Sequence, residues 1–122
     1  MTRVLVVDDE PDVCLLLHLQ LEAAGFEVVG ESHDGQSAVI KAADTHPEAV
    51  VLDLLMPKMT GFEAIPKLQA LDPDLVIVAY TAVAGDYVRQ EMERLQVALV
   101  LKSGDITPLA QAIDAGVAAK QS

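Results

Sequence analysis

The stretch "AVVLDLLMPKMTG", residues 49–61, runs from four apolar residues directly into an aspartate and then a loop. Residues 49–52 have the length and composition of a buried strand, and Asp53 stands at its carboxyl end. A bare carboxylate is costly to remove from water, so a charge in this position needs a partner. Groups elsewhere in the chain must therefore stabilise Asp53.

Strand-length apolar runs recur along the chain and are separated by segments of helix length. They cover residues 3–7, 26–31, 49–52, 75–80 and 98–101. Strands that alternate with helices indicate βαβ units and a parallel sheet. Four of the runs are continuously apolar, as in strands covered on both faces, whereas residues 26–31 are partly polar and fit an edge. We predict an α/β doubly wound sheet of five parallel strands, in the order 2-1-3-4-5, with five helices.

Length, composition and charge argue against several other classes of protein. A length of 122 residues with 52% hydrophobic residues predicts one domain, residues 1–122. The net charge of −11 argues against direct binding of nucleic acid or of an anionic membrane surface. Because no apolar run approaches the roughly eighteen residues of a membrane span, we expect a cytoplasmic protein. The single cysteine, Cys14, is interpreted as a small apolar helix residue.

The first helix is expected to bury one apolar stripe. At roughly 100° per residue, this stripe comprises Val13, Leu16, Leu17, Leu21 and Ala24. Leu15 and Leu19 then point away from the core. Scattered surface leucines are common, whereas a cluster on one helix marks a docking face, and both interpretations stay open. His18, His33 and His46 lie in separate segments without metal-ligand spacing and are interpreted as surface residues.

Polar residues stand at four of the predicted strand ends. Asp8 and Asp9 follow the first strand, Asp53 follows the third, Thr81 ends the fourth, and Lys102 follows the fifth. The carboxyl ends of parallel strands meet at one edge of the sheet, where ligands bind. Clustered carboxylates repel one another unless they take up protons or a cation. Mg²⁺ prefers oxygen ligands and is commonly held by one or two carboxylates, so we predict a magnesium site here.

A metal site alone would not need the ammonium of Lys102 or the hydroxyl of Thr81. Together these two groups suit a phosphoryl group. A carboxylate can be the nucleophile of phosphoryl transfer, and Asp53 is the best-placed carboxylate. Each residue alone is common in turns or on surfaces, so the prediction rests on their conjunction. Glu10 is interpreted as a first-turn acid favoured by the helix dipole.

Four motifs carry a family resemblance: "VLVVDDEP" at 4–11, "DLLMPKMTG" at 53–61, "YTA" at 80–82 and "VLK" at 100–102. In this order and spacing they resemble the receiver domain of bacterial two-component response regulators, over essentially the whole chain. The resemblance implies a flavodoxin-like fold with the strand order predicted above.

The resemblance also implies roles for individual residues. Asp53 matches the phospho-acceptor. Asp8 and Asp9 match the acidic pair that binds Mg²⁺, and Leu55 matches the position whose backbone carbonyl completes the metal site. The chain is then a signalling switch of a phosphorelay, and not an enzyme.

Thr81 matches the switch hydroxyl, and Lys102 matches the lysine that pairs with the phosphoryl group. The implied donor is a histidine kinase or a histidine phosphotransfer protein, and Leu15 and Leu19 lie on the helix where such donors dock in the family. The output domain or partner is unknown, and a homodimer through the face of the fourth and fifth helices stays open.

Two positions depart from the family pattern. Leu99 stands where the family often has an aromatic residue that couples to the switch threonine, so that Tyr80 or Tyr87 would have to substitute. Ser103 stands where proline usually follows the lysine, so that the special peptide geometry of that turn is not expected after Lys102.

Two other classes of function stay open. Phosphatases of the haloacid dehalogenase type also use an aspartate nucleophile with Mg²⁺, but they need a second aspartate where this chain has Leu55. A phosphate-independent interaction module with a receiver fold is the other alternative. Because the apolar residues Leu55 and Val83 flank the site and cannot orient an attacking water, we expect an aspartyl phosphate that is fairly long-lived.

Overall fold

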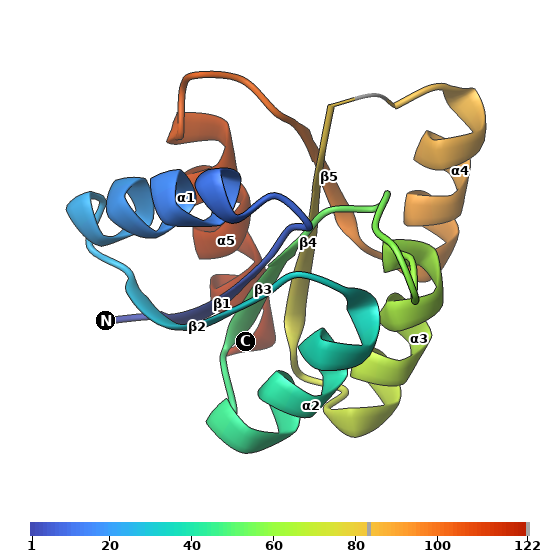
Figure 1. The fold of residues 1–122 in the computed structure, drawn as a ribbon, viewed down its shortest axis with the longest axis horizontal. Coiled ribbons are helices and arrows are strands. Elements are labelled where there is room, and N and C mark those ends of the chain that lie inside the picture. Colours follow the sequence, from blue (N-terminus) through green and yellow to red (C-terminus); the bar gives the residue numbers. More distant parts are fainter. Residues whose placement is uncertain (83, 122) are drawn as a thin grey trace.

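The computed structural model describes residues 1–82 and 84–121 and shows one parallel α/β sheet with helices on both sides (Figure 1). In chain order the elements are β1 (Arg3–Val7), α1 (Pro11–Ala23), β2 (Glu27–Ser32), α2 (Gly35–Thr45), β3 (Ala49–Leu52), α3 (Gly61–Leu71), β4 (Val76–Thr81), α4 (Asp86–Leu95), β5 (Ala98–Leu101) and α5 (Thr107–Lys120). The strands are parallel and lie in the order β2-β1-β3-β4-β5. The predicted fold class and strand order are confirmed.

The helices form two layers around the sheet. Helices α1 and α5 cover one face, and α2, α3 and α4 cover the other (Figure 1). Alternate residues of the central strands supply the two cores, because successive side chains of a strand point to opposite faces. In β1, Leu5 and Val7 pack towards α2 and α3, whereas Val4 and Val6 pack towards α1 and α5.

The strand boundaries follow the apolar runs closely. β1, β3 and β5 cover the predicted residues, and β2 and β4 begin and end one residue later than predicted. β5 is covered on both faces as expected, although incompletely: Leu99 packs against the core on the side of α2, α3 and α4, and Val100 packs against the core on the side of α1 and α5. Ala98 and Leu101, the first and last residues of this edge strand, are exposed.

The buried face of α1 differs from the predicted stripe. Cys14, Leu17 and Leu21 are the buried residues, whereas Leu16 is 55% exposed. This helix carries apolar residues on opposite sides, so the periodicity of the sequence does not decide which side faces the sheet. Leu15 and Leu19 point outwards as predicted, and with Leu16 they form an exposed patch that we call the outer leucine face.

Among the described residues, no helix has both the length and the apolar character that a membrane crossing requires.

Candidate phosphoryl and metal site

The register of the central strands places Asp8 next to Asp53. Val7, the last residue of β1, pairs with Leu52, the last residue of β3, so both aspartates follow directly at neighbouring strand ends. The backbone N–H of Asp53 donates to the carbonyl of Val7 at 3.0 Å, and that of Asp8 donates to the carbonyl of Ser32 at 3.0 Å. The main chain therefore fixes the starting points of both side chains.

Lys102 reaches this pair from the far edge of the sheet. Its backbone N–H donates to the carbonyl of Thr81 at 2.8 Å, which anchors the residue at the end of β4. Its Nζ lies 2.5 Å from Oδ2 of Asp8 and 3.4 Å from Oδ2 of Asp53. One ammonium group thus contacts both carboxylates, and it supplies the partner that the charge of Asp53 requires.

The residues predicted for the site divide into a buried group and an exposed group. Asp8, Asp53 and Thr81 are buried, and Lys102 is mostly so, whereas Asp9 is exposed. The buried set lies at the strand ends, and Asp9 lies on the loop above β1. The site is therefore open to solvent on the side of Asp9.

Burial raises the pKa of Asp53, and the charge of Asp8 raises it further, while Lys102 opposes both effects. Burial alone would lower the pKa of Lys102, but its hydrogen bond to Asp8 and the charges of Asp53 and Asp8 outweigh burial and raise the pKa. Lys102 is therefore a permanent cation at neutral pH. The raised pKa of Asp53 marks a carboxylate that would gain from a cation in addition to the lysine.

Three carboxylates at the start of α1 could hold such a cation. One oxygen from each of Asp8, Asp9 and Glu10 lies within 4.8 Å of the others. The backbone N–H of Glu10 also donates to Oδ1 of Asp8 at 3.0 Å. Sequence reasoning treated Glu10 as a helix-dipole acid, but its proximity to Asp8 and Asp9 makes it a further oxygen donor of this cluster.

The loop after Asp53 depends on a close approach of two backbones. The N–H of Leu55 faces Oδ1 of Asp53 at 3.4 Å, and the side chain of Leu55 is exposed. A Cβ built on Gly61 would lie 2.5 Å from the carbonyl oxygen of Asp53, which only glycine avoids. Sequence reasoning did not single out Gly61, although a glycine at the end of residues 49–61 is a signal for a close approach of two backbones.

The sequence matches the response regulator receiver domain over residues 4–114. The chemotaxis protein CheY of Thermotoga maritima is 38% identical over 80 residues, which are 66% of this chain and 67% of that protein. The chain belongs to the response regulator receiver domain family. It is therefore a receiver domain of two-component signalling.

Solved structures agree with this assignment. A two-component response regulator of the LuxR family from Aurantimonas is 31% identical, with a TM-score of 0.90 over 98% of this chain and 87% of that one. The response regulator TrrA of Thermotoga maritima, solved in complex with Mg²⁺-BeF, is 28% identical, with a TM-score of 0.85 over 95% of this chain and 99% of that one. Among other curated relatives, the matched segment spans only 23% to 39% of their length.

The two departures from the family pattern can be located in this receiver domain. Tyr80 is buried and donates its hydroxyl hydrogen to the carbonyl of Ser103 at 3.2 Å, whereas Tyr87 is 71% exposed on α4. Of the two tyrosines considered as substitutes for Leu99, only Tyr80 therefore contacts the turn after Lys102. The peptide bonds of the described residues are all trans, including the one that follows Lys102.

Two apolar residues were expected to flank the site, and the structure describes one of them. Leu55 is exposed beside Asp53, whereas Val83 lies outside the described residues. The role of the Leu55 carbonyl in metal binding stays a prediction.

Proposed function

We propose that this receiver domain accepts a phosphoryl group on Asp53, from the phosphohistidine of a histidine kinase or histidine phosphotransfer protein. The observation that carries the proposal is the contact of the Lys102 ammonium with both Asp8 and Asp53 at the carboxyl edge of the sheet. A structural ion pair alone would not need two carboxylates and an adjacent Thr81 buried at the same edge.

The donor set suits Mg²⁺. The candidate ligands are the carboxylates of Asp8, Asp9 and Asp53 with the backbone carbonyl of Leu55, all of them hard oxygen donors. The Mg²⁺-BeF complex of TrrA supports this assignment by likeness. When bound, the ion would offset the negative charge of the phosphoryl oxygens.

In the proposed transfer, an Asp53 oxygen forms a bond to phosphorus as the phosphorus–nitrogen bond of the donor breaks. The electron pair of that bond leaves with the imidazole nitrogen, which gains a proton. Lys102 already stands 3.4 Å from Asp53 and can pair with an incoming phosphoryl oxygen. Positioning and charge neutralisation are the main contributions that a protein makes to this class of reaction.

The product changes the charge balance of the site. An aspartyl phosphate adds roughly 1.5 to 2 negative charges. Lys102 then has a stronger partner than Asp8, and the hydroxyl of Thr81 can donate to the new group. We propose that α4 and β5 respond by a population shift between two arrangements, with Tyr80 as the link to the turn after Lys102.

Several finer assignments stay predictions. The receiver unit is taken to cover residues 1–122, and the outer leucine face is the proposed docking surface for the phosphohistidine donor. A cytoplasmic location, the lack of direct nucleic-acid or membrane binding, and a homodimer through α4 and α5 are expected but untested. We infer a stoichiometric acceptor and not an enzyme, because the exposed Leu55 stands where a phosphatase needs an acid.

Intact mass spectrometry tests the proposal. The chain is incubated with a small-molecule phosphodonor and Mg²⁺, with Asp53→Ala as the matched variant. We expect the mass of one phosphoryl group to be added to the native chain and not to the variant. A native chain that gains no mass, or a variant that gains as much, would rule out Asp53 as the acceptor.

A further inference from the structure

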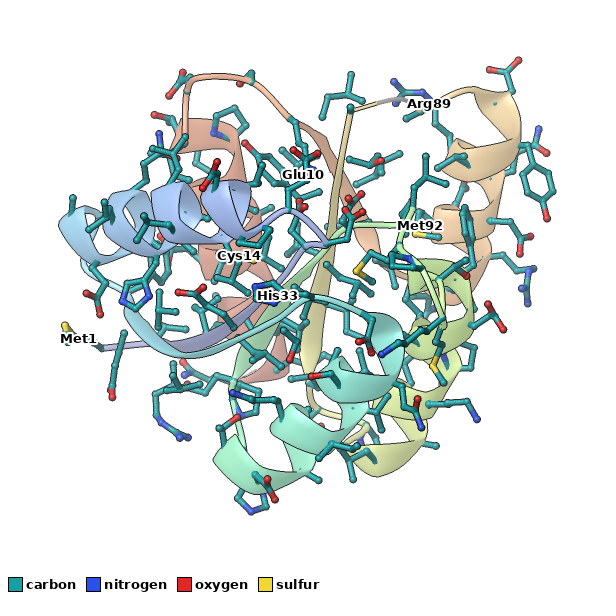
Figure 2. The ribbon with its side chains drawn as sticks, viewed as in Figure 1. Met1, Glu10, Cys14, His33, Arg89 and Met92 are labelled. Carbon is teal, nitrogen blue, oxygen red and sulfur yellow. The ribbon has the colours of Figure 1, made fainter. Side chains whose placement is uncertain are left out.

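A second cluster of ligand atoms lies between α1 and the end of β2. Cys14 of α1, Glu31 of β2 and His33, which follows β2, each offer one ligand atom, and the three atoms lie within 4.8 Å of one another. Figure 2 shows Cys14 and His33 in the space between these two elements. We call these three residues the Cys14 cluster. Sequence reasoning missed it because its members come from separate segments, which meet only when α1 packs on the sheet.

The chemistry of the Cys14 cluster differs from that of the strand-end site. It combines a thiol, a carboxylate and an imidazole, whereas Asp8, Asp9 and Glu10 offer oxygen atoms only. Sulfur and nitrogen donors favour Zn²⁺ and similar ions, and a hard ion such as Mg²⁺ gains little from them. We therefore expect Zn²⁺ to favour the Cys14 cluster and Mg²⁺ to favour the carboxylates of Asp8, Asp9 and Glu10.

The spacing of the three ligand atoms is compatible with an ion after small movements of the side chains. Zinc bonds of about 2.0 to 2.3 Å place tetrahedral ligands about 3.3 to 3.8 Å apart, and the three atoms of the Cys14 cluster already lie within 4.8 Å. Cys14 is fully buried in α1, but Glu31 is partly exposed and His33 is exposed. These two side chains can move towards the sulfur, and solvent water can take the fourth position.

His18 supplies the outer support that metal ligands commonly have. Its Nδ1 lies 2.9 Å from Oε2 of Glu31, and its Nε2 lies 3.3 Å from Oε1 of Glu22. Histidine contacts of this kind fix the orientation of a ligating carboxylate. The second oxygen of Glu31 would remain for an ion.

The thiol of Cys14 is protonated when no ion is present. Burial, with the charges of Asp8 and Glu31, raises the pKa of Cys14 to about 11, and the thiol donates to the carbonyl of Asp8 at 3.4 Å. Binding of a divalent ion replaces this proton: the S–H bond breaks, the proton leaves to solvent, and a metal–sulfur bond forms.

We propose that Cys14, Glu31 and His33 form a Zn²⁺ site that joins α1 to β2, with His18 as the positioning residue for Glu31. The proposed Zn²⁺ site does not depend on phosphorylation of Asp53. An experiment can therefore disprove either proposal without disproving the other.

Co²⁺ is the probe of choice, because a thiolate–cobalt bond gives a charge-transfer absorption and Cys14 is the only cysteine of the chain. The titration is run on the purified chain in excess Mg²⁺, which occupies oxygen-only sites. We expect one equivalent of Co²⁺ to give the thiolate absorption, and Zn²⁺ to displace it. A chain that binds no Co²⁺, or binds it without this absorption, would overturn the proposal.

Variants then separate the ligands. Cys14→Ser should lose the absorption, and His33→Gln, which changes an exposed side chain, should weaken Co²⁺ binding at least tenfold. His18→Gln should weaken it by about tenfold while the absorption stays. His46→Asn is the matched histidine control and should bind as the native chain does. Unchanged affinity in His33→Gln, or loss of the absorption in Asp9→Asn, would contradict the assignment.

Discussion

The ammonium group of Lys102 lies 2.5 Å from a carboxylate oxygen of Asp8, a residue 94 positions earlier in the chain. Lys102 follows the edge strand β5, and the lysine reaches past the end of β4 to the two central strands β3 and β1. Asp8 and Asp53 are both buried there, so without this ammonium group two like charges would face each other at low solvation. The lysine therefore acts as the internal counter-ion of the site.

Replacing Lys102 with methionine should lower the free energy of unfolding at pH 7 by about 2 kcal/mol, because two buried carboxylates lose their partner. Urea unfolding measures this change. The loss should shrink at acid pH, where the carboxylates become protonated, and on addition of Mg²⁺. Lys58→Met is the control, since Lys58 is exposed and lies 3.8 Å from Asp34, and it should change stability by less than about 0.5 kcal/mol. Equal effects of the two substitutions would contradict the counter-ion role.

Replacing Asp53 with asparagine should stabilise the fold at pH 7. The folded-state pKa of Asp53 is raised, chiefly by burial, so the native state holds the proton more strongly than the unfolded chain. The stability that protonation contributes is fully present below the unfolded pKa and is lost as pH rises through the folded pKa. The stability advantage of Asp53→Asn over the native chain should therefore grow as pH rises from the unfolded pKa to the folded pKa of Asp53. Thermal unfolding at several pH values measures this difference. A variant less stable than the native chain at pH 7 would refute this.

Removing the hydroxyl of Tyr80 with Tyr80→Phe should cost about 1 kcal/mol, because the carbonyl of Ser103 loses a partner from a buried side chain. Tyr87→Phe is the matched control, since Tyr87 is exposed, and it should be neutral. Urea unfolding measures stability, and the rate of phosphorylation by a small donor reports on Lys102. If Tyr80→Phe lowers stability without slowing phosphorylation, the hydroxyl holds the turn but does not position the lysine.

Gly61→Ala should destabilise the chain by about 1 to 3 kcal/mol, since the new Cβ would lie 2.5 Å from the backbone carbonyl oxygen of Asp53. Backbone atoms cannot move aside as a flexible side chain can. Gly104→Ala meets nothing within 4 Å and serves as the control in the same denaturation series. A tolerated alanine at position 61 would show that the loop after Asp53 can shift without cost.

Serine at Leu15, Leu16 and Leu19 should slow transfer from a phosphohistidine donor at least tenfold, because the outer leucine face would lose apolar contact area. Labelling by a small phosphodonor should be unchanged, since these side chains point away from the core. Ile40→Ser, on the exposed side of α2, controls for a general loss of surface apolar area. Slower labelling by both donors would indicate damage to the fold and not to a docking surface.

The strand ends could be predicted from the sequence because apolar runs stop abruptly at chemically distinctive residues. The run before Asp53 ends at the edge of the sheet, and the parallel topology brings Asp8, Thr81 and Lys102 to the same edge. Helix α1 was harder, because Leu16 and Leu17 are equally apolar and only packing decides that Leu17 is the buried one.

Contacts between separate segments were the features that sequence reasoning could not supply. The hydrogen bond from Tyr80 to Ser103 depends on how β4 and the turn after β5 are packed, and nothing in either segment signals it. The same holds for Cys14 and His33, which are 19 positions apart and meet through the packing of α1 on β2. Local periodicity carries no information on such pairs.

The half-exposed strand β5 makes the two edges of the sheet unequal in their tolerance of a neighbouring chain. The opposite edge, β2, carries Glu27 and Glu31, and charges on an edge strand oppose the addition of another strand. β5 consists of four apolar residues, and the nearest charge, on Lys102, is turned inwards to Asp8. The short length of β5 limits pairing at this edge, and strand addition between copies at high concentration is expected to begin at β5 rather than at β2.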